Sequence, residues 1–148
     1  MMTYNHKIGY IIAFLLVLIL SFFLATVKVK AETLYGIDWA GKGSDISIEE
    51  KIDIACSHFG CDSNLVKFVA KCESNYRMVW NPSGRNYGIF QYAPTTFNAY
   101  SYSAFSTMME NPDRSKISMY SVDHQVLTTA WAFANGKQRA WECYFKYR

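Results

Sequence analysis

Four cysteines set the first constraint on how this chain can fold. All of them follow an apolar N-terminal segment, and an even number of cysteines in an exported chain favours disulfide bonds. Three pairings are possible. We favour a short link between Cys56 and Cys61, across a turn between helices, and a long link between Cys72 and Cys143. In the chain-entropy model the long loop stabilises the fold by roughly 4 kcal/mol and the short loop by roughly 2 kcal/mol. The long link would anchor the backbone beside Glu73.

The apolar N-terminal segment is typical of a targeting sequence. Lys7 and the amino terminus precede an apolar run at residues 8–25, as in a signal peptide. A run of this length also lies at the lower limit for a membrane-spanning helix. We therefore predict that residues 1–31 form either a signal peptide, cleaved before Glu32, or an N-terminal membrane anchor. Both outcomes place the rest of the chain outside the cytoplasm, in the periplasm, the cell wall or the medium.

Beyond this leader the chain is electrically neutral. Of its 15 basic residues the leader holds Lys7, Lys28 and Lys30, which leaves 12 against 12 acidic residues. A neutral domain lacks the basic surface that nucleic acid requires and is weakly attracted to anionic lipid. We expect no nucleic-acid partner, membrane contact only through the leader, and a monomer. The length suits one domain with one core.

Caps and breakers predict a mostly helical domain over residues 47–148. Residues 32–46 contain several glycines and no sustained period, so we expect a linker or arm there. Ser47 begins a capping box, and Ser121 is placed to cap a last helix. Closely spaced Asn, Pro, Ser and Gly predict loops over residues 74–93. The four predicted helices run from 48 to 59, from 62 or 63 to 73, from 94 to about 104, and from 122 to 135.

Glu73 is a carboxylate on what would otherwise be an apolar helix face. The face that helical spacing predicts consists of Leu65, Phe68, Val69 and Cys72. Glu73 falls inside that arc. A carboxyl group among apolar neighbours has a raised pKa, which suits a general acid that works near neutral pH. The alternative is an ordinary glutamate at a fraying helix end.

Short motifs follow Glu73 in a fixed order. A Glu-Ser pair closes a helix, and an Asn-Pro loop, a Gly-x-x-Gln run and a Pro-x-Thr helix start come after it. They are Glu73-Ser74, Asn81-Pro82, Gly88 to Gln91 and Pro94 to Thr96, followed by the run Ala130 to Lys137 and Trp141. This order resembles the lytic transglycosylase family of the lysozyme superfamily over residues 47–143. The resemblance implies a lysozyme-like α+β fold that is mostly α, with a loop-rich middle bearing at most a small sheet.

The resemblance also implies that Glu73 is the single catalytic residue. In the family one glutamate protonates the oxygen between N-acetylmuramic acid and N-acetylglucosamine in peptidoglycan strands. It then takes the proton of the muramyl C6 hydroxyl, which gives a 1,6-anhydro product without water or cofactor. Residues 74–109 contain no acid, so the loops after Glu73 supply no second carboxylate. The acids that remain for such a role are Glu110, Asp113, Asp123 and Glu142.

Three motif residues are predicted to contact the substrate. Ser74 would hydrogen-bond the Glu73 carboxyl or an acetamido group, with a helix-capping hydroxyl as the alternative. Gly88 has no Cβ and would let a sugar approach the backbone, although a turn glycine is equally ordinary. Gln91 would present its amide to sugar hydroxyls.

One position departs from the family pattern. Many members carry a tyrosine in an Ala-Tyr-Asn-Ala-Gly stretch that assists the glutamate, and the corresponding residue here is Phe133. The missing hydroxyl would come from another tyrosine, such as Tyr87 or Tyr144, or this chain manages without it. Phe133 and Tyr87 are therefore included among the predicted substrate-binding residues.

Two other functions fit the same sequence. A hydrolase of the goose-lysozyme kind would cleave the same bond with water. A catalytically silent, secreted glycan-binding or interaction domain would keep the fold without the chemistry. A metal site is not expected, because there is no Cys-x-x-Cys pair and the histidines His6, His58 and His124 have no ligand spacing.

Overall fold

The computed structural model describes residues 46–147. They belong to the second of two compact units into which the chain divides, Tyr35–Arg148. The predicted leader at residues 1–31 lies outside the described residues, as does the predicted linker at residues 32–46 except for its last residue. Among the helices of residues 46–147, none has the length and apolar character that a membrane span needs.

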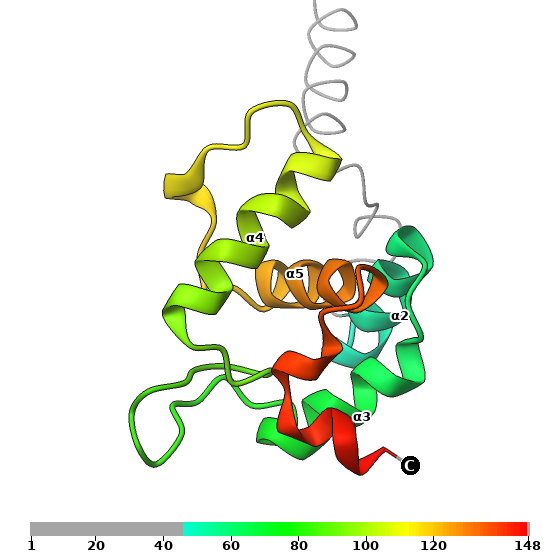
Figure 1. Ribbon diagram of the computed structural model, residues 1–148, viewed down its shortest axis with the longest axis vertical. Coiled ribbons are helices and arrows are strands. Elements are labelled where there is room, and N and C mark those ends of the chain that lie inside the picture. Colours follow the sequence, from blue (N-terminus) through cyan, green and yellow to red (C-terminus); the bar gives the residue numbers. More distant parts are fainter. Residues whose placement is uncertain (1–45, 148) are drawn as a thin grey trace, which may run out of the picture. The chain divides into compact units, whose positions relative to one another are not determined.

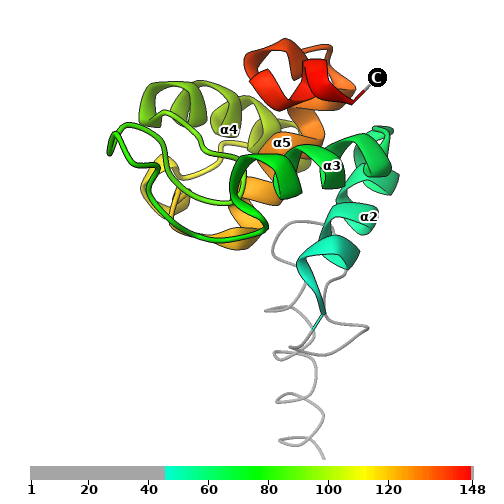
Figure 2. The ribbon, with the colours of Figure 1, turned by 90° about the horizontal axis from the view of Figure 1, so that it is seen from below.

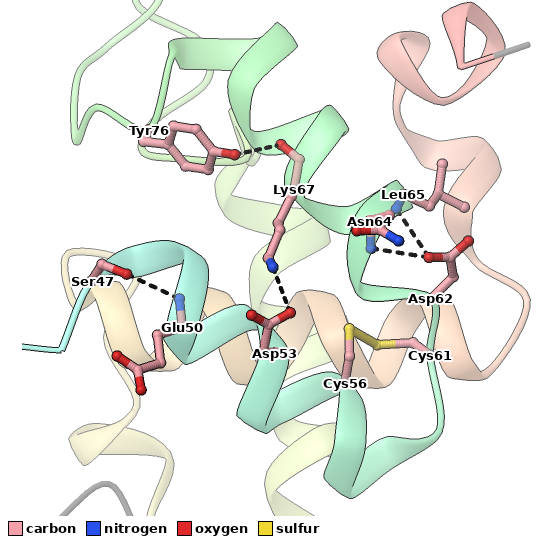
Figure 3. Close-up of polar contacts among 10 residues, drawn as sticks. All are labelled: Ser47, Glu50, Asp53, Cys56, Cys61, Asp62, Asn64, Leu65, Lys67 and Tyr76. Atoms are coloured by element: carbon pink, nitrogen blue, oxygen red, sulfur yellow. Dashed lines mark hydrogen bonds and ion pairs between the residues drawn. A yellow bond between two sulfur atoms is a disulfide. The ribbon is translucent and has the colours of Figure 1, made fainter. Parts of the chain in front are cut away.

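The first two helices follow the capping signals in the sequence. The Ser47 hydroxyl accepts a hydrogen bond from the backbone N–H three residues on, and the Asp62 carboxylate accepts from two N–H groups of the next helix (Figure 3). Gly60 ends the first helix with φ at 79°, a left-handed conformation that glycine adopts without a Cβ clash. The two helices are α2, Ile48–Phe59, and α3, Ser63–Ser74.

Three contacts connect α2 to α3 and the segment after it (Figure 3). The Cys56–Cys61 disulfide spans the turn between the helices. Lys67 of α3 forms an ion pair with Asp53 of α2, and the Tyr76 hydroxyl donates to the Lys67 carbonyl oxygen at 3.1 Å. A partly exposed ion pair contributes at most about 1 kcal/mol, so the disulfide and the packing fix the orientation of α3.

Helix α5 is the central helix of the described residues. It packs against both α2 and α4, with α4 toward one side and α2 toward the other (Figures 1 and 2). Nine of its residues are buried, including the polar Gln125, Thr128 and Thr129, so it is enclosed on most sides. The bounds are Pro94–Met108 for α4 and Val122–Ala134 for α5.

The segment between α3 and α4 is built from loops. Two isolated β-bridges join Trp80 with Tyr87 and Tyr87 with Tyr92, and no longer strand forms within residues 46–147. The prediction of a mostly helical domain with a loop-rich middle is confirmed. Helix α4 continues beyond the predicted end near Ala104, because Ala104 and Phe105 are buried in the core. Residues 46–147 also contain three short 3-10 helices: η2 Arg114–Lys116, η3 Gln138–Ala140 and η4 Glu142–Lys146.

The buried face of α3 is rotated relative to the predicted one. Its buried residues are Val66, Val69, Ala70 and Ser74, and predicted Cys72 is exposed. The core occupies the Val66 side, whereas η4 lies along α3 and the Tyr147 ring, just after η4, contacts Phe68 at 5.1 Å between centroids. Glu73 therefore lies one turn beyond two fully buried residues of the same stripe, Val69 and Ala70.

Both favoured disulfides are present, and all four cysteines are paired. Disulfides persist in oxidising compartments and are rare in the cytosol. The two bonds therefore indicate an extracellular or periplasmic location. The Cys72–Cys143 bond joins α3 to η4 across a sequence separation of 71 residues.

Candidate active site

Glu73 lies in the last turn of α3 and is half-buried. Its Oε1 atom accepts a hydrogen bond from the Cys143 backbone N–H at 3.4 Å. The preceding residue, Cys72, is bonded to the same Cys143, with 5.9 Å between the two Cα atoms. Two consecutive residues of α3 are thus attached to the start of η4, one covalently and one through its carboxylate.

Burial raises the pKa of the Glu73 carboxyl above its ordinary value. The Cys143 N–H opposes this effect because it stabilises the carboxylate, and the positive charge of Lys146 opposes it more weakly. The negative charge of Glu142 adds to the rise, and the net result is a raised pKa. A carboxyl that holds its proton at higher pH than usual is suited to protonate a leaving group.

A polar cleft of about 450 Å³ opens beside this carboxyl. Trp141 forms a rigid part of its lining, because the ring is buried and its Nε1–H donates to the Phe90 carbonyl oxygen at 2.8 Å. The other lining side chains are mainly acids and amides, which can hydrogen-bond hydroxyl and acetamido groups. The cleft is lined by Glu73, Asn81, Asn86, Gln91, Ala140, Trp141 and Glu142.

The amide wall of the cleft belongs to a short hairpin, residues 79–88. The Gly88 N–H donates to the Val79 carbonyl and the Asn81 N–H donates to the Asn86 carbonyl, both at 2.9 Å. The Asn81 side-chain oxygen accepts from three groups within the hairpin loop and so fixes the shape of that loop. Asn81 entered the sequence argument only as part of a loop motif, and Asn86 was missed because its position depends on this pairing.

Gln91 is held in the cleft by its amide nitrogen. Nε2 donates to the Gly88 carbonyl at 2.8 Å and to the Val79 carbonyl at 3.0 Å. Its Oε1 atom is buried and has no hydrogen-bond partner among the described residues. A buried acceptor without a partner is destabilising by about 1–3 kcal/mol, and the burial of Oε1 keeps it out of reach of a ligand in the cleft.

Three of the residues predicted to bind the substrate, Ser74, Gly88 and Phe133, make contacts within the protein. The Ser74 hydroxyl is buried, donates to the Ile89 carbonyl at 2.8 Å and accepts from the Arg77 N–H at 3.0 Å. Its hydrogen bonds go to the backbone and not to Glu73. Phe133 is only 8% exposed and packs on Trp141, with 5.1 Å between ring centroids, which places it in the core.

Gly88 is also a packing position. A Cβ atom there would lie 1.8 Å from Gln125 Nε2. Gln125 is fully buried and ties two loops together, since Nε2 donates to the Met119 carbonyl at 2.7 Å and Oε1 accepts from the Phe90 N–H at 3.4 Å. The close approach that glycine permits in this structure is to the Gln125 side chain.

Neither tyrosine proposed to replace the missing hydroxyl lines the cleft. Tyr87 packs its ring between Trp80 and Tyr120, at 4.9 and 5.0 Å between centroids. Tyr144 packs against Phe145 in η4. Among the described residues no tyrosine is part of the cleft lining.

Glu142 is the acid that the fold brings to Glu73. It lines the same cleft and is exposed. The other acids considered from the sequence lie elsewhere: Asp113 caps η2 and Asp123 forms an ion pair with Lys51, while the exposed Glu110 does not line the cleft. The signal in the sequence was indirect, because pairing Cys72 with Cys143 places their neighbours Glu73 and Glu142 together.

The fold and the cleft define a small, mostly helical, disulfide-bonded domain with a half-buried acid beside a polar cleft. No protein-family model matches the chain, and no curated protein or solved structure matches it significantly. Within residues 46–147, no group of three or more His, Cys, Asp or Glu side chains is arranged to hold a metal ion. A functional assignment therefore depends on the site itself and on the order of the motifs.

Proposed function

We propose that this chain is an exported lytic transglycosylase with a lysozyme-like fold, which cleaves peptidoglycan strands with Glu73 as its acid. The observation that carries the proposal is the half-buried Glu73 carboxyl, with its raised pKa, at the edge of a polar cleft. The motif order that resembles the family supports the same assignment, since the Glu-Ser pair, the hairpin and Gly-x-x-Gln all contribute to the surroundings of this cleft.

The chemistry follows from the two protonation states of one carboxyl. Protonated Glu73 gives its proton to the oxygen that bridges N-acetylmuramic acid and N-acetylglucosamine, and the bond from this oxygen to the muramyl C1 breaks. The resulting carboxylate takes the proton of the muramyl C6 hydroxyl as that oxygen bonds to C1. The products are a free C4 hydroxyl and a 1,6-anhydro end, and no water is consumed.

The surroundings of Glu73 suit both halves of this cycle. Burial favours the protonated acid that the first half requires. The Cys143 N–H, 3.4 Å from Oε1, favours the carboxylate that forms next. The amides of Asn81 and Asn86 would hold the hydroxyl and acetamido groups of the sugars.

A second candidate, a hydrolase of the same bond, is favoured by one observation. Glu142 lines the cleft with Glu73. Most glycoside hydrolases use two catalytic carboxyl groups that flank the scissile bond. In that reaction Glu142 would activate water and the product would carry a reducing end. A catalytically silent binding domain gains nothing from a half-buried acid, so it is the weakest of the three.

Digestion of purified peptidoglycan followed by mass spectrometry of the released muropeptides tests the proposal. We expect 1,6-anhydro ends with the wild-type chain and no release with Glu73→Gln. Products with reducing ends would show that the chain is a hydrolase and not a transglycosylase. No products from a correctly folded and disulfide-bonded wild-type chain would contradict both enzymatic functions.

A further inference from the structure

Large apolar side chains are exposed at two places among the described residues. One place, at the C-terminal end of the described part, has Phe145 and Tyr147. The other has Trp80, which is 46% exposed, and Tyr120, which is 63% exposed. Exposed apolar surface that is concentrated in one area marks a binding site more often than scattered residues do.

Trp80 and Tyr120 are joined into one strip by Tyr87. The ring centroids lie 4.9 Å apart for Trp80 and Tyr87, and 5.0 Å apart for Tyr87 and Tyr120. The strip thus combines the hairpin with the loop before α5, two segments that are distant in sequence. We call these three residues the aromatic strip.

The hairpin geometry places the aromatic strip on the opposite side of the hairpin from the cleft. Trp80 and Tyr87 face each other as a non-hydrogen-bonded antiparallel pair, flanked by the Asn81–Asn86 and Val79–Gly88 hydrogen bonds. Successive side chains of a strand point to opposite faces. Accordingly, Asn81 and Asn86 line the cleft whereas Trp80 and Tyr87 do not.

The composition of the strip suits sugar rings. Tryptophan and tyrosine offer flat apolar faces together with N–H and O–H groups, which match the apolar faces and the hydroxyls of a pyranose. A strand of peptidoglycan is much longer than the cleft, so sugars beyond the cleft remain available to a neighbouring surface. The same hairpin contributes to both surfaces, with the cleft on one of its faces and the strip on the other.

We infer that the aromatic strip is a second glycan-docking surface, outside the cleft, that holds the protein on polymeric peptidoglycan. The inference rests on the proposed function for its choice of glycan. Docking through the strip raises the effective concentration of glycosidic bonds at the cleft without new contacts to the reacting sugar. The strip therefore contributes more on an insoluble polymer than on a short soluble fragment.

The test measures binding of the exported chain to insoluble peptidoglycan sacculi, in a Glu73→Gln background so that the ligand is not consumed. Tyr120→Ala removes a ring that is mostly in solvent, and we expect binding to weaken roughly three- to tenfold. Trp80→Ala should weaken it at least as much, and Trp80→Phe should retain most of the affinity. Phe145→Ala is the matched control, because Phe145 is 57% exposed but lies outside the strip.

Unchanged binding of Tyr120→Ala and Trp80→Ala would overturn the inference, as would no measurable binding of the parent chain. An equal loss from Phe145→Ala would also overturn it, since it would indicate general adhesion. In chains that keep Glu73, the strip variants should lose more activity on sacculi than on a soluble glycan fragment. The proposed function is judged separately by muropeptide release, so a wild-type chain that cleaves while the strip variants bind normally would contradict this inference alone.

Discussion

One wall of the cleft is closed covalently, whereas the other is held by hydrogen bonds alone. On the first wall, Glu73 and Glu142 are each adjacent to a cysteine of the Cys72–Cys143 bond. On the second wall, the hairpin at residues 79–88 presents amides whose positions depend on backbone pairing and on Asn81. In the proposed reaction, the covalent wall would carry the proton transfer and the hydrogen-bonded wall would bind the sugar.

The largest expected effect comes from the acid on the covalent wall. Glu73→Gln keeps nearly the same shape but cannot give up a proton, so cleavage should fall at least 100-fold while folding and glycan binding persist. Muropeptide release measures cleavage and sacculus binding measures glycan binding, both on the same preparation. Residual activity above roughly 1% of wild type would mean that another carboxyl carries the chemistry.

Removing the covalent link should destabilise the whole domain. Cys72→Ser with Cys143→Ser should lower the free energy of unfolding by roughly 4 kcal/mol, because the bond closes a loop of 71 residues. Cys56→Ser with Cys61→Ser is the matched comparison, with an expected loss of roughly 2 kcal/mol for a separation of five residues. Denaturant unfolding measures both.

For this comparison, peptide mapping without reductant should recover both native links from the wild-type chain. The two walls would no longer differ in the way described if removing the Cys56–Cys61 bond cost more unfolding free energy than removing the Cys72–Cys143 bond. Free thiols in the wild-type chain would have the same consequence.

The hydrogen-bonded wall should be sensitive at Gly88. Alanine there would place a Cβ 1.8 Å from Gln125 Nε2 at a φ of 90°, and we expect a loss of about 3 kcal/mol from backbone strain and broken hydrogen bonds. Gly84→Ala is the control, because Gly84 also has a positive φ, 68°, but nothing lies within 4 Å of its Cβ position. Its expected loss is about 1 kcal/mol. Equal losses of stability for Gly88→Ala and Gly84→Ala would show that the Gln125 side chain moves aside at little cost and does not hold the hairpin in place.

The smallest effect on rate is expected at Glu142. For a transglycosylase, Glu142→Gln should keep activity within roughly tenfold, about 1.4 kcal/mol of transition-state stabilisation. The charge of Glu142 raises the pKa of Glu73, so its removal lowers that pKa. Because an acid catalyst must be protonated, the fall in activity on the alkaline side should then begin at lower pH.

Singly made Glu110→Gln, Asp113→Asn and Asp123→Asn serve as controls for Glu142, because these acids do not line the cleft. They should leave activity within the same tenfold range and the pH profile unmoved. A thousandfold loss from Glu142→Gln in a folded protein, with reducing ends among the products, would instead identify a hydrolase with two carboxylates.

The sequence was most informative where the physics is local. Ser47, Asp62 and Ser121 cap helices as predicted, because a cap needs only the next few N–H groups. Glu73 is half-buried as its helix position indicated, and its pKa is raised for the predicted reason, burial. Of the three possible disulfide pairings, the favoured one is present.

The sequence was least informative where a motif residue can point in more than one direction. Ser74 and Gly88 match the motif, yet their neighbours Ile89 and Gln125 direct them into the scaffold. Phe133 sits near the end of a helix that is enclosed on most sides, so it became a core residue. Glu142 lies in 3-10 turns that carry no periodic signal, and only the folded chain shows that it reaches the cleft.

The Cys72–Cys143 bond also bears on when the site around Glu73 forms during synthesis and folding. The N–H group that holds Glu73 follows it by 70 residues, so the acid remains incomplete until nearly the whole domain has been made and folded. The link that secures this arrangement forms only under oxidising conditions. We therefore expect newly synthesised chains to lack this arrangement in a reducing cytosol and to acquire it once the disulfide forms in an oxidising compartment.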